Sequence, residues 1–414
     1  MAGWQQVLAS MASNVEKHFD VLKSRLDDRL GGQDPIKIVP YHGYGTQQRL
    51  YLKGRVLKDQ GVAPAGDNDS LWRNLVNTYR RLESDEIAHA RLRARFQGHE
   101  QEVTAGEEGY FELWLEPGRP LDESRLWHEI ELELLDPLPE SREPVRATGR
   151  VMVPSRQAQF VVISDIDDTV VQSHATQLLR MARTVFLGNA RTRLPFPGVA
   201  AFYRALHSTS ATVNPLFYVS SSPWNLYDLL LEFFALQDIP IAPTFLRDWG
   251  ISEREMLPTG HRDHKLALIC QMLEVYSHLP FILIGDSGQE DPEIYHEVVH
   301  QYPERILAVY IRNVSRDVER PQAIQTLAQE VLDAGSTLIL ADDTLVMAEH
   351  AAEQGWIDPA ALASIQLEKE QDEAPPTPLE AMLGDEEEEE APTVVIETDK
   401  GADASPLPPH LLRK

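Results

Sequence analysis

Three aspartates lie within four positions directly after an apolar run, in the segment VVISDIDDTVV. Burying Asp165, Asp167 and Asp168 together would be costly unless a cation joined them. Mg2+ is the simplest companion, because this hard ion prefers carboxylate and carbonyl oxygens. An aspartate can also attack phosphorus to form an aspartyl-phosphate, while a second carboxylate two positions on protonates the leaving oxygen and then activates water. The D-x-D-x-T spacing that ends at Thr169 supplies both groups. The alternative is an acidic turn that caps a helix.

Three further segments carry side chains that the same chemistry needs. In FYVSSSPWN an apolar run ends at Ser220, whose hydroxyl could hold a phosphoryl oxygen beside the free N–H groups of a helix start. In HRDHKLALI, Lys265 could neutralise the charge on a phosphoryl group during its transfer. In FILIGDSGQEDPEIY an apolar run ends at Asp286, a candidate metal ligand, and Asp291 follows after four intervening residues. Taken singly, these residues also fit a helix start, a solvated lysine and a turn.

The elements that must position these residues follow from the apolar pattern after residue 158. Short apolar runs alternate with helical stretches, which predicts a parallel sheet with helices on both faces, the doubly wound α/β arrangement. In such folds ligands bind beyond the carboxyl ends of the strands, where these residues lie. The predicted strands are 161–163, 216–219, 281–284, 306–311 and 338–340, and the predicted helices are 198–207, 223–236, 262–277, 292–300 and 320–333.

In chain order, these four motifs resemble those of the haloacid dehalogenase superfamily, whose members are Mg2+-dependent phosphotransferases on a doubly wound sheet. Asp167 implies a phosphatase, since the superfamily's dehalogenases lack that acid/base residue. The segments SDIDDTV, YVSSSPWNLYDLLLEF, HKLALI, GDSGQEDPEIY and YIRNV are more closely similar to the catalytic domain of the actin-patch-associated phosphatidate phosphatase family, over residues 158–315. The reaction that this resemblance implies is hydrolysis of phosphatidate to diacylglycerol and phosphate.

The resemblance also implies a role for each matching residue. Asp165 would be the nucleophile and Asp167 the general acid/base. The residues that would bind Mg2+ are Asp165, Asp167 through its carbonyl, Asp286 and, as a supporting or alternative ligand, Asp291. The residues that would hold the phosphate or support its loop are Ser220, Lys265 and Thr169. Whether Ser220 or Ser221 faces the phosphate stays open, and the resemblance does not place Arg247 or Arg312.

The region before the catalytic motifs has a different period. Between residues 35 and 157, apolar and polar residues alternate in several short runs, which predicts an antiparallel β-sandwich-like domain. Its HGYG segment at residues 42–45 is expected to be a turn. Residues 1–31 carry apolar side chains at steps of three and four, which indicates an amphipathic helix that packs on the next domain. The predicted organisation is therefore a helix at 1–31, a β-rich domain at 35–157, a catalytic domain at 158–366 and a tail at 367–414.

The amino-acid composition limits which partners and which cellular locations are expected for this protein. With 38 Lys and Arg against 65 Asp and Glu, the formal charge is −27, which argues against nucleic-acid binding. The single cysteine, Cys270, excludes an internal disulfide framework and fits a reducing compartment. No apolar run is long enough to span a bilayer, so a cytoplasmic protein is expected, with possible peripheral contact at a membrane. The acidic, proline-rich tail is expected to be disordered.

Three functions compete on this sequence. The first is a Mg2+-dependent phosphatidate phosphatase that contacts a membrane surface transiently. The second is the same chemistry on a soluble phosphomonoester, because fold and motifs do not fix a substrate. Between Thr169 and Ser220, the apolar and basic segment LLRMARTVFLGNARTRLPF could either meet lipid headgroups through its arginines or form an ordinary packed cap helix. The third is a non-catalytic adaptor that uses its β-rich domain, which the intact set of catalytic residues disfavours.

Overall fold

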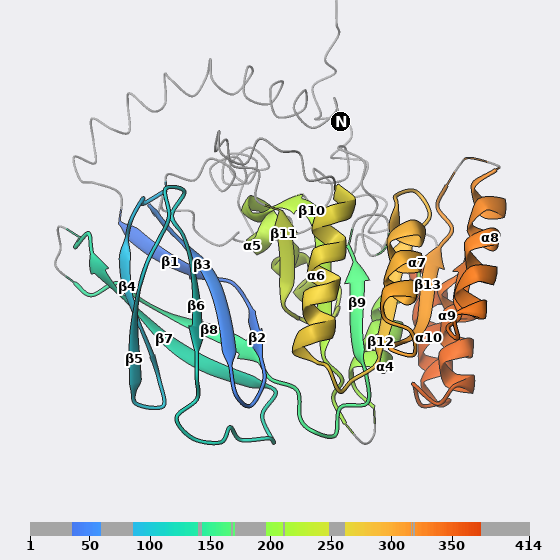
Figure 1. Cartoon of the computed structure of the whole chain (residues 1–414), viewed down its shortest axis with the longest axis horizontal. Coiled ribbons are helices and arrows are strands. Elements are labelled where there is room, and N and C mark those ends of the chain that lie inside the picture. Colours follow the sequence, from blue (N-terminus) through green and yellow to red (C-terminus); the bar gives the residue numbers. More distant parts are fainter. Residues whose placement is uncertain are drawn as a thin grey trace, which may run out of the picture. The chain divides into compact units, whose positions relative to one another are not determined.

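The computed structural model describes residues 35–58, 86–139, 143–166, 169, 196–209, 212–247, 261–315, 317 and 319–373, which form two sheets with helices around the second (Figure 1). These residues belong to one compact unit. The predicted helix at 1–31, Asp167 and the arginine-bearing stretch at 170–195 lie outside the described residues. The tail from residue 374 lies outside them as well.

The first sheet is rich in antiparallel strands, as the period of two predicts. Its strands follow the order β1-β3-β2-β8-β7-β4-β5, and β6 pairs with β3. In β7, alternate residues such as Ile130 and Leu132 are buried while Glu129 and Glu131 are exposed. The buried residues of six strands share one core, so the single sheet encloses a core as a sandwich would. The bounds are β1 (Ile36–Pro40), β2 (Gly43–Gly45), β3 (Leu50–Lys58), β4 (Arg91–Phe96), β5 (His99–Thr104), β6 (Tyr110–Leu115), β7 (Trp127–Asp136) and β8 (Arg146–Met152).

The HGYG segment is a strand, and the expected turn is wrong. Residues 43–45 form β2, which pairs antiparallel with β3 and parallel with β8. A Cβ atom on Gly43 would lie 2.1 Å from the backbone oxygen of Tyr51, so glycine is needed where these backbones approach closely. Glycines in a short segment predict a turn, because the local sequence does not show that another strand lies close to the backbone.

The second sheet is parallel throughout and doubly wound, as predicted. Its order is β11-β10-β9-β12-β13-β14. The chain runs outward from β9 to β11 and then returns to β12 on the other side of β9, so the strand order reverses beside β9. The strands are β9 (Val161–Asp165), β10 (Leu216–Pro223), β11 (Thr244–Arg247), β12 (Phe281–Asp286), β13 (Ile306–Arg312) and β14 (Leu338–Ala341).

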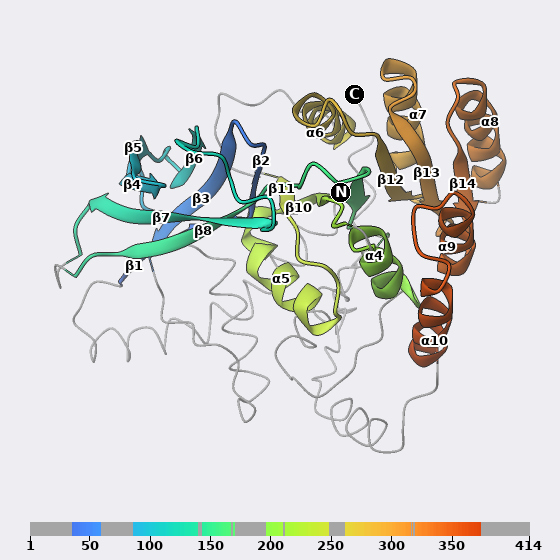
Figure 2. The same ribbon diagram turned by 90° about the horizontal axis from the view of Figure 1, so that it is seen from below.

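Helices cover both faces of this sheet (Figure 2). Helices α6, α7 and α8 lie on one face, and α4, α5, α9 and α10 lie on the other. Successive strand residues face opposite cores: Val161 and Ile163 join one, and Val162 joins the other. This explains the near-continuous apolar runs. The helices are α4 (Val199–His207), the 3-10 turn η1 (Trp224–Leu226), α5 (Tyr227–Leu236), α6 (His261–Val275), α7 (Asp291–Gln301), α8 (Arg320–Asp333), α9 (Thr344–Glu353) and α10 (Ala361–Glu373).

All five predicted strands and all five predicted helices of this region are confirmed. The pattern missed the edge strand β11 and the helices α9 and α10. Helix α10 runs to Glu373, seven residues beyond the predicted end of the catalytic domain at 366. It packs through Ile365, which is fully buried. Within the described residues, every helix is too short or too polar to cross a bilayer.

Several hydrogen bonds join the first sheet to the helices around the second. The Tyr44 hydroxyl on β2 accepts a hydrogen bond from Gln271 Nε2 on α6 (2.8 Å), and the Tyr276 hydroxyl after α6 donates one to the Gly45 carbonyl (3.1 Å). Arg55 on β3 donates to the Asn225 side chain, 3.0 Å away, just after the serine-rich segment. The β-rich region therefore braces elements that flank the candidate site.

Candidate active site

The carboxyl ends of β9 and β12 bring two of the predicted aspartates to adjoining positions. Asp165 is the last residue of β9 and Asp286 is the last residue of β12. These strands are neighbours, with Ser164 opposite Ile284. Because the strand order reverses here, this is the edge at which a doubly wound sheet binds its ligand. Asp165 is 1% exposed and Asp286 is fully buried.

Lys265 bridges the aspartates from helix α6. Its Nζ donates to Asp165 Oδ1 at 2.8 Å and to Asp291 Oδ1 at 2.5 Å. The lysine is only 4% exposed, so it is a buried residue held by two carboxylates and not a solvated surface lysine. Burial alone would lower the pKa of Lys265, but the carboxylates of Asp165 and Asp291 outweigh it and raise that pKa above its usual value. Lys265 is therefore a fixed ammonium.

The GDSGQED loop is shaped around its two aspartates. Asp286 Oδ1 accepts hydrogen bonds from the backbone N–H groups of Gly288 (2.6 Å) and Gln289 (3.0 Å). The first residue of α7 is Asp291, whose Oδ2 accepts one from the Asp286 N–H at 3.2 Å. A Cβ atom on Gly285 would lie 2.3 Å from Asp291 Oδ2, so a larger residue would displace this carboxylate. The glycine before Asp286 thus makes room for Asp291.

Ser220 and Thr169 also lie at this edge. Val219 on β10 pairs with Asp165, which places Ser220 one position beyond the level of that aspartate. Ser220 is 1% exposed, and its Oγ accepts a hydrogen bond from the Ser222 N–H at 2.9 Å. Thr169 Oγ1 donates to Asp165 Oδ2 at 3.4 Å. The strand β10 does not end with the apolar run at Ser220, as expected, but continues through Pro223.

The described carboxylates suit a hard divalent cation. One carboxylate oxygen from each of Asp165, Asp286 and Asp291 lies within 4.8 Å of the other two, and all three side chains are buried. With the ammonium of Lys265, these side chains carry a net charge of −2. Burying such charge is costly without compensation, and Mg2+ would supply it through oxygen ligands. The residues present therefore fit the metal that the family resemblance implies. Asp167 lies outside the described residues.

Arg312 is a further cation at the same edge, which sequence reasoning left unplaced. It ends β13 directly opposite Asp286 and is 4% exposed. Its Nη2 donates to Thr344 Oγ1 at 2.9 Å, and its guanidinium lies 4.2 Å from the centre of the Phe196 ring. Burial lowers the pKa of Arg312 to about 10. Like Asp165 and Asp286, Arg312 is the polar last residue of an apolar strand, and this is the sequence signal that could have identified it.

The part of the chain that carries these residues is similar to a known catalytic domain. Residues 160–313 match the family model described as phosphatidate phosphatase APP1, catalytic domain. We call residues 160–313 the APP1-like segment. The APP1-like segment contains Asp165, Ser220, Lys265, Asp286 and Asp291, so the whole described cluster lies inside the match.

Two curated relatives extend this similarity. The Saccharomyces cerevisiae protein named phosphatidate phosphatase APP1 is 35% identical over 158 residues, which cover 38% of this chain and 26% of that protein. A Schizosaccharomyces pombe protein described as uncharacterized protein C29B5.04c is 28% identical over 319 residues, which cover 74% of this chain and 51% of that protein. This chain thus spans about half of one relative and about a quarter of the other.

One solved structure has only a weak similarity to this chain. A carbohydrate acetylesterase from Xanthomonas citri is 11% identical, with a TM-score of 0.24 over 70% of this chain and 72% of that one.

Proposed function

We propose that this chain is a Mg2+-dependent phosphatidate phosphatase that works through an aspartyl-phosphate on Asp165. The observation that carries the proposal is the buried ion pair between Lys265 and Asp165, beside Asp286, inside the APP1-like segment. A buried carboxylate held by a fixed ammonium at the reversal point of a doubly wound sheet suits nucleophilic attack on an anionic phosphoryl group. The motif order also supports the haloacid dehalogenase-like assignment of this domain.

In the first step, a carboxylate oxygen of Asp165 forms a bond to phosphorus while the bond from phosphorus to the glycerol oxygen breaks. Asp167 gives a proton to the departing oxygen, which yields diacylglycerol. In the second step, water attacks phosphorus, Asp167 takes its proton, and phosphate leaves Asp165. Lys265 and Ser220 hold the phosphoryl oxygens during both steps. Mg2+, held by Asp165, the Asp167 carbonyl and Asp286, would supply charge neutralisation.

Asp291 has a positioning role in this scheme. It shares Lys265 with Asp165 and accepts the N–H of Asp286, so it fixes the lysine and the metal-binding aspartate relative to one another. Preorganised charges of this kind lower a barrier because they need no rearrangement during the reaction. Phosphate-monoester hydrolysis needs this help, since enzymes accelerate it by up to about 10^21-fold.

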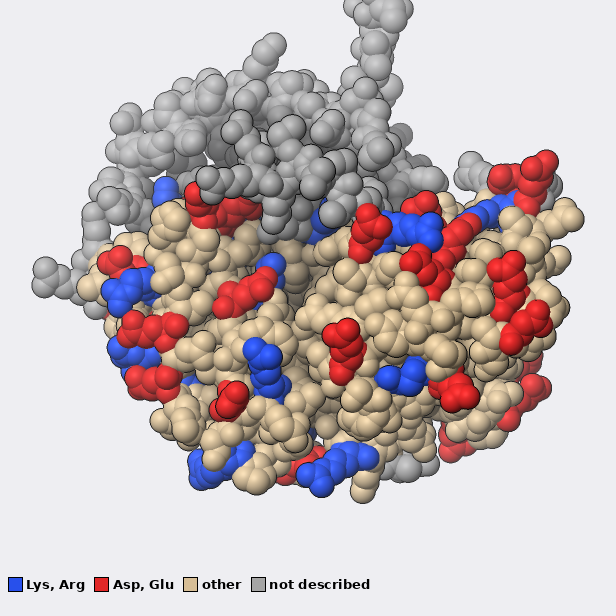
Figure 3. All heavy atoms as spheres, viewed as in Figure 1, with Lys and Arg blue, Asp and Glu red and all other residues tan. Residues whose placement is uncertain are grey.

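The similarity to yeast phosphatidate phosphatase APP1 is what favours phosphatidate over a soluble phosphomonoester as the substrate. A lipid substrate requires transient contact with a membrane surface, and we assign that contact to the catalytic edge of the protein. On the face seen in Figure 3, acidic and basic side chains are interspersed, so the described residues there do not form one large basic patch. A cytoplasmic location with peripheral membrane contact remains our prediction.

The test is phosphate release from phosphatidate in detergent micelles and from a soluble aryl phosphate, each with Mg2+ or EDTA. Wild type is compared with Asp165→Asn and with a matched control, Asp263→Asn, whose carboxylate is exposed on α6. We expect Mg2+-dependent release that favours the lipid, a loss of at least about 1,000-fold in Asp165→Asn, and no loss in the control. Turnover of only the aryl phosphate would keep the chemistry and discard the lipid. No turnover of either would favour the adaptor.

A further inference from the structure

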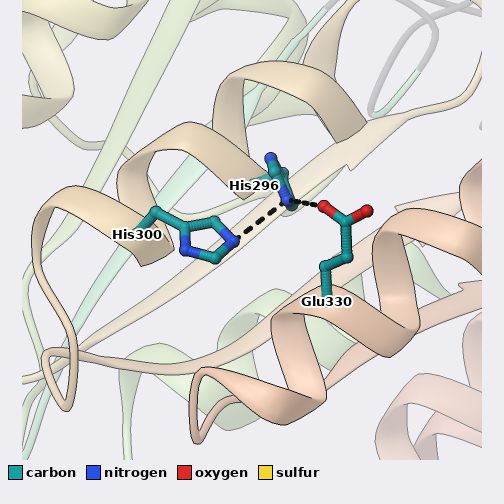
Figure 4. Close-up of side chains that lie close together, drawn as sticks. All are labelled: His296, His300 and Glu330. Atoms are coloured by element: carbon teal, nitrogen blue, oxygen red, sulfur yellow. Dashed lines mark hydrogen bonds and ion pairs between the residues drawn. The ribbon is translucent and has the colours of Figure 1, made fainter.

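A second group of metal-binding side chains lies away from the catalytic edge, between helices α7 and α8 (Figure 4). His296 and His300 are one turn apart on α7, and Glu330 faces them from α8. The Nε2 atoms of the two histidines are 3.1 Å apart, and His296 Nε2 is 2.7 Å from Glu330 Oε2. We call these three residues the α7–α8 cluster. His296 is partly buried, whereas His300 and Glu330 are exposed, so solvent ions can reach it.

Hydrogen bonds alone cannot satisfy all three polar atoms of the α7–α8 cluster well. Each imidazole nitrogen carries either one proton or one lone pair, which points in a single direction in the plane of the ring. If His296 Nε2 carries a proton toward Glu330, it cannot also accept one from His300. If it accepts from His300, its lone pair faces the Glu330 carboxylate. A single proton shared between both neighbours would make two weakened bonds. A cation among the three atoms would satisfy all of them at once.

The spacing fits a transition-metal ion. Zinc bonds to histidine nitrogen and carboxylate oxygen at about 2.0–2.2 Å in a tetrahedron, which sets neighbouring ligand atoms roughly 3.3 Å apart. The contacts of 3.1 and 2.7 Å reach that separation with shifts of a few tenths of an ångström in the exposed side chains of His300 and Glu330. The ligand atoms of all three residues lie within 4.8 Å of one another. Two imidazoles with one carboxylate favour zinc-class ions over Mg2+, which prefers oxygen ligands.

The local sequence has the spacing of a helical zinc motif but not its catalytic arrangement. Residues 296–300 read HEVVH, the H-E-x-x-H pattern in which two histidines on one helical face bind zinc and the glutamate acts as a base. Here Glu297 accepts a hydrogen bond from Arg262 Nη2 on α6 at 2.7 Å and another from Gln301 Nε2 at 2.9 Å. Its carboxylate is therefore engaged away from the cluster. The geometry supports metal binding and not hydrolysis.

We propose that the α7–α8 cluster binds one zinc-class divalent ion through His296, His300 and Glu330, with water as the remaining ligand. The ion joins α8 to α7, the helix that begins at Asp291, and so fastens the helix that carries part of the catalytic cluster. This site is separate from the carboxylate site and takes a different class of metal. It does not depend on the proposed phosphatase activity.

The test is calorimetric titration of ZnCl2 into the full chain, prepared without a histidine tag and with millimolar Mg2+ present to occupy the carboxylate site. Wild type is compared with His300→Ala and Glu330→Gln, and with His278→Ala, which removes an exposed histidine after α6. We expect one Zn2+ per chain in wild type and in His278→Ala, and binding weakened by at least about tenfold in the two cluster variants. Asp286→Asn should retain this zinc binding, because it alters only the carboxylate site.

A second measurement separates ligand loss from misfolding. Zn2+ should raise the melting temperature of wild type and of His278→Ala, and should leave that of His300→Ala unchanged, while all three melt alike in EDTA. Tetrahedral Co2+ absorption should appear on adding CoCl2 to wild type and be lost in His300→Ala. The proposal is overturned if wild type binds no stoichiometric Zn2+, if both cluster variants bind it as wild type does, or if Asp286→Asn abolishes it.

Discussion

Replacing Lys265 with methionine removes the only ammonium among four buried side chains and leaves three carboxylates facing one another. At an effective dielectric constant of about 20, each contact of Lys265, at 2.8 and 2.5 Å, is worth roughly 6 kcal/mol before desolvation. Desolvation of the ions offsets several kcal/mol of that attraction, so we expect a net loss of about 3–5 kcal/mol in the free energy of unfolding in EDTA. Mg2+ should not restore wild-type stability, because the hydrogen bonds of the ammonium are also lost.

The assay is urea unfolding followed by tryptophan fluorescence, with Lys53→Met as the matched control. Lys53 Nζ lies 3.0 Å from Glu112, whose side chain is 53% exposed, so its loss should cost only about 0–1 kcal/mol. The folded-state pKa of Lys265 is raised above its unfolded value of 10.5, so its contribution is complete below pH 10.5 and is lost only as the pH rises further. A loss equal to that of the control would refute the buried ion-pair reasoning.

Three other perturbations test separate parts of the structure. Gly285→Ala places a Cβ atom 2.3 Å from Asp291 Oδ2 and should cost about 1–3 kcal/mol and most of the activity, whereas Gly106→Ala, whose nearest neighbour is 3.8 Å away, should cost less than about 1 kcal/mol in the same urea assay. Mg2+ at 100 times its Kd should stabilise wild type by about 2.7 kcal/mol and Asp286→Asn by much less, and equal melting shifts in both would remove Asp286 from the metal site. Burial lowers the pKa of His42 from 6.5 to about 4, so the stability that its neutral form contributes is complete above pH 6.5 and falls by about 2–3 kcal/mol toward pH 4. Unfolding titrations across that range should show this loss in wild type and not in His42→Gln, and parallel pH profiles would contradict it.

The sequence predicted the parallel sheet well because its signal is local. Strands buried on both faces are nearly all apolar, and each is followed by a helix, so both patterns can be found without knowledge of tertiary contacts. The strand β11 escaped because it is a four-residue edge strand, in which only alternate residues are buried. The HGYG segment was misread for a related reason, since Gly43 is needed where its backbone closely approaches that of Tyr51 on another strand.

The sequence predicted which residues belong to the candidate site better than it predicted the contacts between them. Strand ends and motif spacing identified Asp165, Lys265 and Asp286, and the structure brings them together. What the sequence could not give is that Lys265 bonds to Asp291 as well as Asp165, because that contact depends on how α6 packs against α7. Likewise, the HEVVH pattern can be read from the chain, but the third ligand, Glu330, comes from a separate helix.

The most direct test of the proposed mechanism is to find the covalent phosphate on Asp165. Wild type is mixed with 32P-labelled phosphatidate and Mg2+, quenched in acid within one turnover, reduced with borohydride and mapped by mass spectrometry. We predict homoserine at position 165, formed from its aspartyl-phosphate, and no such product in EDTA or in Asp165→Asn. Label on another residue, or full turnover by Asp165→Asn, would contradict it.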